Sequence, residues 1–179
     1  MSRKTLMTIH LYLAAFFTPM IVIMAVSGGL YLFDIKGSMD KGTPIVIAGA
    51  ELKGNDDAGI EHIKSLLSGA GLDDGFEYLK DRGSMMQTRP TSRDYYEIKQ
   101  TPQGVEFTPV SPSLVAAMME LHKGHGPQIF RTLQQVLAVG LVLILISGLI
   151  LGLQSPMLKN KTIAVTAGGI LVFVLVAAF

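Results

Sequence analysis

Long apolar stretches separate the chain into membrane-like and polar parts. Residues 6–33 contain no charged side chain, and neither do residues 133–153. A helix needs about 20 residues to cross the ~30 Å apolar core of a bilayer, so each stretch predicts a transmembrane helix. Residues 163–179 are also apolar but barely long enough to span. The pattern therefore predicts three membrane helices, with a local kink in the first at Pro19.

The polar middle of the chain predicts a small α+β domain between the first two spans. Apolar residues recur at helical spacing over residues 56–67, and a second helix is expected over 113–122, with Ser111 or Ser113 as its N-cap. Alternating polar and apolar positions predict four short strands, at residues 76–80, 85–88, 95–99 and 104–107.

The expected fold class is therefore a membrane α-helical protein with three transmembrane helices and an inserted α+β domain. The expected segments are residues 1–34 (N-terminus and first helix), 35–126 (polar domain), 127–154 (second helix), 155–162 (loop) and 163–179 (third helix).

Charge distribution predicts the orientation of these segments. All 14 acidic residues lie between Asp34 and Glu120, so both apolar ends contain none. Basic residues precede the first span and follow the second, and such flanks favour the cytoplasmic side. The expected location is a bacterial inner membrane, with a cytoplasmic N-terminus and residues 35–126 in the periplasm. A cleaved signal peptide is the alternative for residues 6–33, but its apolar core would be shorter, roughly 7–15 residues.

Composition narrows the possible chemistry. The chain has no cysteine, which excludes disulfides, thiolate metal sites and covalent haem attachment. The net charge of +1 gives no sign of a nucleic-acid partner, whereas the apolar spans require membrane lipid. The polar domain contains no phosphate-binding loop and no catalytic triad, so no catalytic residue is assigned.

Histidines beside the spans are the candidate ligands. His10 lies near one end of the first span, and His122 and His125 precede the second. Ionisable groups at membrane depth invite a functional hypothesis, and neutral imidazole is the usual ligand of non-covalent haem. The sequence leaves open whether His122 or His125 is the ligand. An interfacial histidine without any ligand is the simpler alternative, and His62 on the domain surface is expected to have no special role.

Glycines near the ends of both spans strengthen the hypothesis. The first span ends in Ser27-Gly28-Gly29-Leu30, and Ser147-Gly148 lie near the end of the second. Because the spans are antiparallel, we expect each glycine notch to lie at the depth of a histidine, where a flat macrocycle could approach the backbone. Small residues also pack membrane helices together, so a packing face is the competing interpretation. Arg131 is a candidate partner for a haem propionate or an ordinary interfacial arginine.

These segments resemble the PepSY-associated transmembrane family. The resemblance is carried by His10-Leu11-Tyr12-Leu13, Ser27-Gly28-Gly29-Leu30-Tyr31-Leu32-Phe33, Leu121-His122 and Ser147-Gly148-Leu149-Ile150-Leu151. It implies a PepSY module in the polar domain and an inner-membrane haem protein of electron transfer, related to ferric-siderophore reductases. This chain has three expected spans, whereas such relatives usually have four or more.

The resemblance leads to one functional expectation and one alternative. The expectation is a haem b protein with bis-histidine ligation, transferring electrons across the membrane for periplasmic reduction of ferric iron or a ferric siderophore. Because histidines are few, we expect a homodimer that completes each ligand set, and a redox partner in the membrane or periplasm. Whether the chain is itself a ferric reductase stays open. The alternative is a non-enzymatic accessory subunit or peptidase regulator whose PepSY-like domain binds a partner protein.

Overall fold

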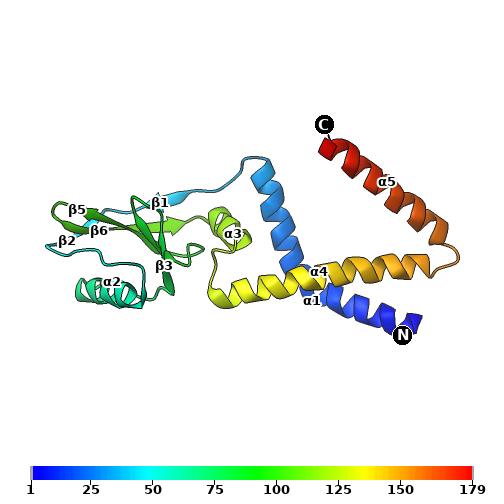
Figure 1. Ribbon diagram of the computed structural model, residues 1–179, viewed down its shortest axis with the longest axis horizontal. Coiled ribbons are helices and arrows are strands. Elements are labelled where there is room, and N and C mark those ends of the chain that lie inside the picture. The colour runs from blue at the N-terminus through cyan, green and yellow to red at the C-terminus, as the bar shows by residue number, and fades with distance from the viewer. Residues whose placement is uncertain (1, 179) are drawn as a thin grey trace. The chain divides into compact units, whose positions relative to one another are not determined.

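The computed structural model describes residues 2–178, and its elements follow the order in Figure 1. The helices are α1 (Arg3–Leu32), α2 (Asp57–Gly69), α3 (Leu114–His122), α4 (Gln128–Leu153) and α5 (Lys159–Ala178). The strands are β1 (Met39–Lys41), β2 (Ile45–Ala48), β3 (Tyr78–Asp81), β4 (Met86–Arg89), β5 (Tyr95–Thr101) and β6 (Gly104–Pro112). The chain forms two units, Met1–Ile21 with Gln135–Phe179 and Val22–Gln134.

Three of the helices, α1, α4 and α5, are long and apolar enough to cross a membrane. Their most apolar windows have mean hydropathies of 2.1, 2.9 and 2.1, and few of their residues are buried within the protein. Apolar side chains that no other part of the protein covers are unfavourable in water, so the surface of these helices is suited to contact with lipid. The structure thus has the expected number of membrane-length helices among the described residues.

The third apolar helix begins earlier than its charge pattern indicates. Helix α5 begins at Lys159, inside the region expected as a loop at residues 155–162. Lysine is a good helix former, and its long side chain can reach out of an apolar layer from the first turn of a helix. Lys159 and Lys161 therefore mark the polar end of the apolar stretch, but the helix itself already includes them.

Local chemistry accounts for where the helices begin and end. Asp34 follows α1 with a φ of 61°, and Ile35 N–H donates to the Leu30 carbonyl, which closes the helix with a Schellman-type turn. Helix α2 is capped by Asp56, whose carboxylate accepts from Gly59 N–H. Of the two serines expected to cap α3, Ser113 is the one that does so.

The domain between α1 and α4 is built on an antiparallel sheet. Its strand order is β1-β6-β5-β4-β3, and β2 also pairs with β6. The four expected strands are present, and the hairpin between β5 and β6 pairs Thr101 with Gly104. Strands β1 and β2 are not among the predicted strands, and β6 extends to Pro112, beyond its predicted end at residue 107. Both missed strands are very short, and they depend on β6 for their backbone partners.

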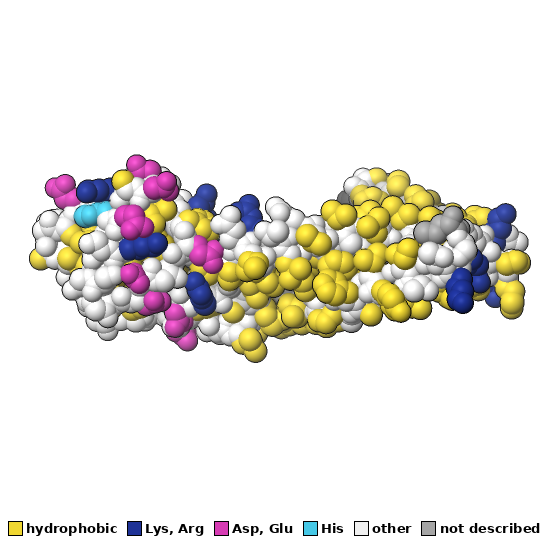
Figure 2. Space-filling model, turned by 90° about the horizontal axis from the view of Figure 1, so that it is seen from below, with side chains coloured by type: hydrophobic (Ala, Val, Ile, Leu, Met, Phe, Trp, Pro, Cys, Tyr) yellow, Lys and Arg dark blue, Asp and Glu magenta, His cyan; other side chains and the backbone are white. Residues whose placement is uncertain are grey.

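One side of the sheet packs against α2 to form the core of the domain (Figure 1). The buried cluster consists of Ile63, Leu67, Leu79, Ile98, Val105 and Phe107. Acidic side chains gather on the surface of this domain, whereas hydrophobic side chains cover the long helices (Figure 2). The domain therefore has a core like that of a water-soluble protein, and the long helices do not.

Candidate functional site

His122, the last residue of α3, lies against the end of α1. Its Nδ1 is 2.8 Å from the hydroxyl of Ser27, and that hydroxyl is also 3.1 Å from the Met24 carbonyl. A β-carbon added at Gly28 would lie 3.3 Å from Cε1 of His122, closer than most carbon contacts in proteins. The absence of a side chain at Gly28 therefore lets the imidazole rest on the helix backbone.

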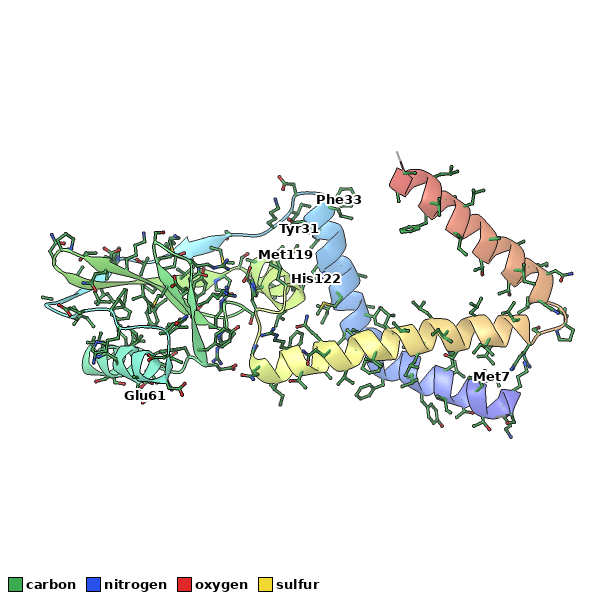
Figure 3. The ribbon with its side chains drawn as sticks, in the orientation of Figure 1. Met7, Tyr31, Phe33, Glu61, Met119 and His122 are labelled. Atoms are coloured by element: carbon green, nitrogen blue, oxygen red, sulfur yellow. The ribbon has the colours of Figure 1, made fainter. Side chains whose placement is uncertain are left out.

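A pocket of about 330 Å³ opens beside this imidazole. Figure 3 shows Tyr31, Met119 and His122 gathered there from α1 and α3. Lys123 also lines the pocket and gives it one cationic side chain. Its volume is at the lower end of the range for small-molecule sites. The site offers a single histidine, an apolar wall and one positive charge.

The same arrangement occurs a second time, between α1 and α4. Nδ1 of His10 is 2.9 Å from the hydroxyl of Ser147, which is also 3.0 Å from the Ile144 carbonyl. A β-carbon at Gly148 would lie 3.2 Å from Cε1 of His10. A serine, the glycine after it and a histidine from another helix thus form two sites of the same local geometry.

The hydrogen bonds indicate which ring nitrogen of each imidazole carries a proton. A serine hydroxyl has a single proton, and in each site that proton is within reach of the carbonyl three residues earlier in the helix. The oxygen is then left to accept a proton from Nδ1–H of the histidine. On this basis we place a proton on Nδ1 of both His10 and His122. In a neutral ring with its proton on Nδ1, the lone pair lies on Nε2.

His125 has a different environment from His122. Its Nδ1 is 2.7 Å from Oε2 of Glu120, a carboxylate that also accepts from Lys123 and from the hydroxyl of Thr91. Arg89 donates to Thr91 and lies 3.7 Å from the same carboxylate oxygen. The backbone carbonyl of His125 accepts from Thr91 N–H. His125 therefore belongs to an ionic network that joins β4, α3 and the loop after it.

Burial and pairing shift the titrations within this network. Burial alone would raise the pKa of Glu120, but hydrogen bonds from Lys123, Thr91 and His125 lower it to about 2. Burial lowers the pKa of His125, and the positive charge of Arg89 acts in the same direction, against the hydrogen bond to Glu120. Glu120 is thus an anion and His125 a neutral donor at neutral pH.

The remaining residues named from the sequence lie elsewhere. Arg131 lines a separate pocket that contains His125, and a β-carbon at Gly29 would meet nothing within 4 Å. His62 bonds the backbone carbonyl of Glu51 on the domain surface. The structure therefore brings His122 together with Ser27 and Gly28, and His10 with Gly148, while His125, Arg131 and Gly29 lie outside these two arrangements.

Several residues around His122 are not recognisable as site residues from the sequence. Tyr31 and Met119 resemble ordinary apolar span or core residues, and only the juxtaposition of α1 with α3 places them beside an imidazole. Lys123 follows His122 directly, so a search for cations beside candidate ligands could have found it. Within residues 2–178, no three histidine or acidic side chains are grouped closely enough to hold a metal ion by themselves.

The fold and these sites define a class of protein. It has three membrane-length helices, with a helix-backed antiparallel sheet between the first and second, and histidines held by serines of the long helices. The family model described as PepSY_TM-like matches residues 74–179, more than half of the chain, and the protein belongs to this family. No curated protein and no solved structure shows a significant match to the chain.

Proposed function

We propose that the protein is an inner-membrane haem b protein that transfers electrons across the membrane, with His122 and His10 as axial ligands. The observation that supports the proposal is the hydrogen bond that joins Nδ1 of each histidine to a serine hydroxyl, Ser27 for His122 and Ser147 for His10. A histidine ligand of iron needs a free lone pair on one nitrogen, and its other nitrogen is usually fixed by a hydrogen bond. Both imidazoles meet this requirement.

The surroundings of His122 also suit a flat apolar group with anionic edges. Gly28 keeps the backbone close to the ring, and Tyr31 and Met119 supply apolar cover. Lys123, which pairs with Glu120, is the cation nearest to a bound carboxylate. Bound haem would supply one-electron chemistry, and the protein would supply ligation, orientation and exclusion of water. The proposed physiological reaction is reduction of ferric iron or a ferric siderophore on the periplasmic side.

One chain offers one imidazole at each of the two arrangements, so bis-histidine ligation requires a second copy. Both imidazoles are at least partly exposed on the protomer, and His10 lies in the apolar, membrane-length helix α1. A polar ring edge in lipid is costly unless a partner or ligand covers it. We therefore propose a homodimer in which His10 faces its copy, and His122 faces its copy. A monomer with fully bound, six-coordinate haem would contradict this part of the proposal.

The test is a visible spectrum of the full chain, expressed with sufficient haem, purified in detergent, and recorded before and after dithionite. We expect the sharp reduced α-band of six-coordinate b-type haem, with a Soret absorbance that scales with protein. His122→Ala and His10→Ala should each remove part of this absorbance. His62→Ala is the matched control, because His62 contacts only the domain surface through Glu51. A featureless spectrum of the unmodified protein would overturn the proposal.

A second candidate is a non-enzymatic accessory subunit whose PepSY-like domain binds a partner protein, including a regulated peptidase. The observation that favours it is that each imidazole already has a protein hydrogen-bond partner, which ties two helices together without a cofactor. The accessory role predicts that His122→Ala alters the thermal stability of the full chain while the purified protein has no haem absorbance. The spectrum therefore separates the two candidates.

A further inference from the structure

The α3–α4 connection and the sheet form a second pocket, distinct from the one at His122. Its volume is about 270 Å³. Its lining side chains are Tyr78, Lys80, Arg89, Lys123, His125 and Arg131. Four of these six are basic side chains, and none is acidic. The pocket is therefore built to attract an anion.

Only part of this positive charge is balanced. Glu120 forms an ion pair with Lys123 and lies close to Arg89. Among residues 2–178, no carboxylate is within ion-pair distance of Lys80 or Arg131. Two cations, Lys80 and Arg131, thus line the pocket without a protein counter-ion.

The guanidinium of Arg89 gives an independent indication of a ligand. The residue is 2% exposed and lines the pocket, yet its Nε has no acceptor among the described residues. Only the hydroxyl of Thr91 accepts from Nη1 at hydrogen-bond distance, because Glu120 is 3.7 Å away. Buried charged groups are normally fully hydrogen-bonded. Nε of Arg89 is therefore a buried donor without an acceptor, in a side chain that lines a cationic pocket.

The position of the pocket along the chain indicates the source of the anion. Arg131 lies in the first turn of α4, and the uncharged stretch of that helix begins at Leu133. Arginine and tyrosine at the polar boundary of a membrane helix lie at the depth of lipid headgroups. We propose that this pocket binds the phosphate of an anionic phospholipid headgroup, with Arg131 and Lys80 as its main contacts.

A phosphate suits these donors better than a single carboxylate. Its several acceptor oxygens can bond the planar fork of an arginine and a lysine ammonium together. The pocket shares only Lys123 with the one beside His122, so the lipid site does not depend on haem binding. A bound lipid would fix the sheet domain against the headgroup layer through β3, β4 and α4.

The experiment is a native mass spectrometry titration of the delipidated full chain in detergent. Phosphatidylglycerol is the probe, phosphatidylcholine the zwitterionic control, and inorganic phosphate the competitor. We expect retention of one phosphatidylglycerol per chain, at least tenfold tighter than phosphatidylcholine. Arg131→Gln and Lys80→Gln should each weaken binding about tenfold, the loss expected for one charge-assisted hydrogen bond. Lys53→Gln, which removes an exposed lysine elsewhere on the domain, should leave it unchanged.

Three outcomes would overturn the proposal. Equal binding of both lipids would mean that the headgroup charge is not recognised. Equal competition by inorganic phosphate at matched concentration would assign the pocket to a soluble anion. Loss of haem absorbance, with lipid retention unchanged, in Arg131→Gln and Lys80→Gln would make the pocket a propionate site. Lys80 is exposed on β3, so Lys80→Gln should retain the tyrosine near-UV circular dichroism of the folded domain and keep the test valid.

Discussion

The long helices and the sheet domain satisfy their polar side chains in different ways. In the helices, Ser147 and Ser27 each pair a neutral hydroxyl with a histidine. In the domain, the carboxylate of Glu120 accepts hydrogen bonds from Lys123, Thr91 and His125. A charge is costly at membrane depth, whereas a buried charge in a soluble domain is tolerated when it is fully paired. Polar pairs without charge are therefore the type expected in helices surrounded by lipid, and ionic networks the type expected in a domain surrounded by water.

The two regions also differ in how apolar side chains contribute to stability. The domain buries a cluster around Phe107 beneath α2, whereas α5 has no buried residue among those described. Burial within the protein stabilises the first region through the hydrophobic effect. The second depends on lipid to cover its side chains, because apolar contact with lipid tails costs nothing relative to contact with another helix.

The largest effect should come from truncating the domain core. Phe107 is fully buried, so Phe107→Ala should destabilise the domain by about 4 kcal/mol through lost burial and a residual cavity. Phe173→Ala in α5 is the matched change on a side chain that is 73% exposed, and it should leave unfolding of the domain unchanged. Urea unfolding of the full chain in detergent, followed by tyrosine near-UV circular dichroism, measures both. If both substitutions destabilised the domain equally, the claim that only the sheet domain is stabilised by a buried core would be wrong.

The ionic network should make the stability of the domain depend on pH. The pKa of Glu120 falls from 4.5 to about 2 on folding, so the unfolded chain binds the proton first. The stabilisation, roughly 3 kcal/mol, should be complete above pH 4.5 and disappear as the pH falls towards 2. Urea midpoints of the full chain measured across this range provide the test.

Glu120→Gln should flatten this part of the profile and lower the stability at neutral pH, because Arg89 then loses its nearest carboxylate. Glu51→Gln is the control, since Glu51 is exposed. An unchanged profile in Glu120→Gln would assign the pH dependence to other carboxylates.

The smallest effect should come from the neutral pairs of the long helices. Ser27→Ala or Ser147→Ala removes one hydrogen bond to a histidine and should cost about 1 kcal/mol. The more informative measurement is the tautomer, read from ¹⁵N chemical shifts of the imidazoles. Each variant should release its histidine into a mixture of tautomers, while Thr18→Ala, whose hydroxyl bonds only its own helix, should not. A tautomer unchanged in both variants would remove the main support for metal ligation.

Several features of the fold follow from local patterns of residues. Charge-free stretches marked the membrane-length helices, and alternation marked the four strands from β3 to β6. Antiparallel spans with a histidine and a serine-glycine pair near their ends also led to the expectation of two similar sites. Local signals were sufficient there because helix length, strand alternation and capping depend on residues close together in the chain.

Other features depend on contacts between parts of the chain that are far apart in the sequence. Ser27 meets His122, and Thr91 bonds Glu120, which also accepts from His125. Likewise, β1 and β2 exist as strands because β6 supplies their hydrogen-bond partners. The two histidines look equivalent in the sequence because both are near a helix end. Their chemistry differs because Nδ1 of His122 meets the hydroxyl of Ser27 in α1, whereas Nδ1 of His125 meets the carboxylate of Glu120 in α3.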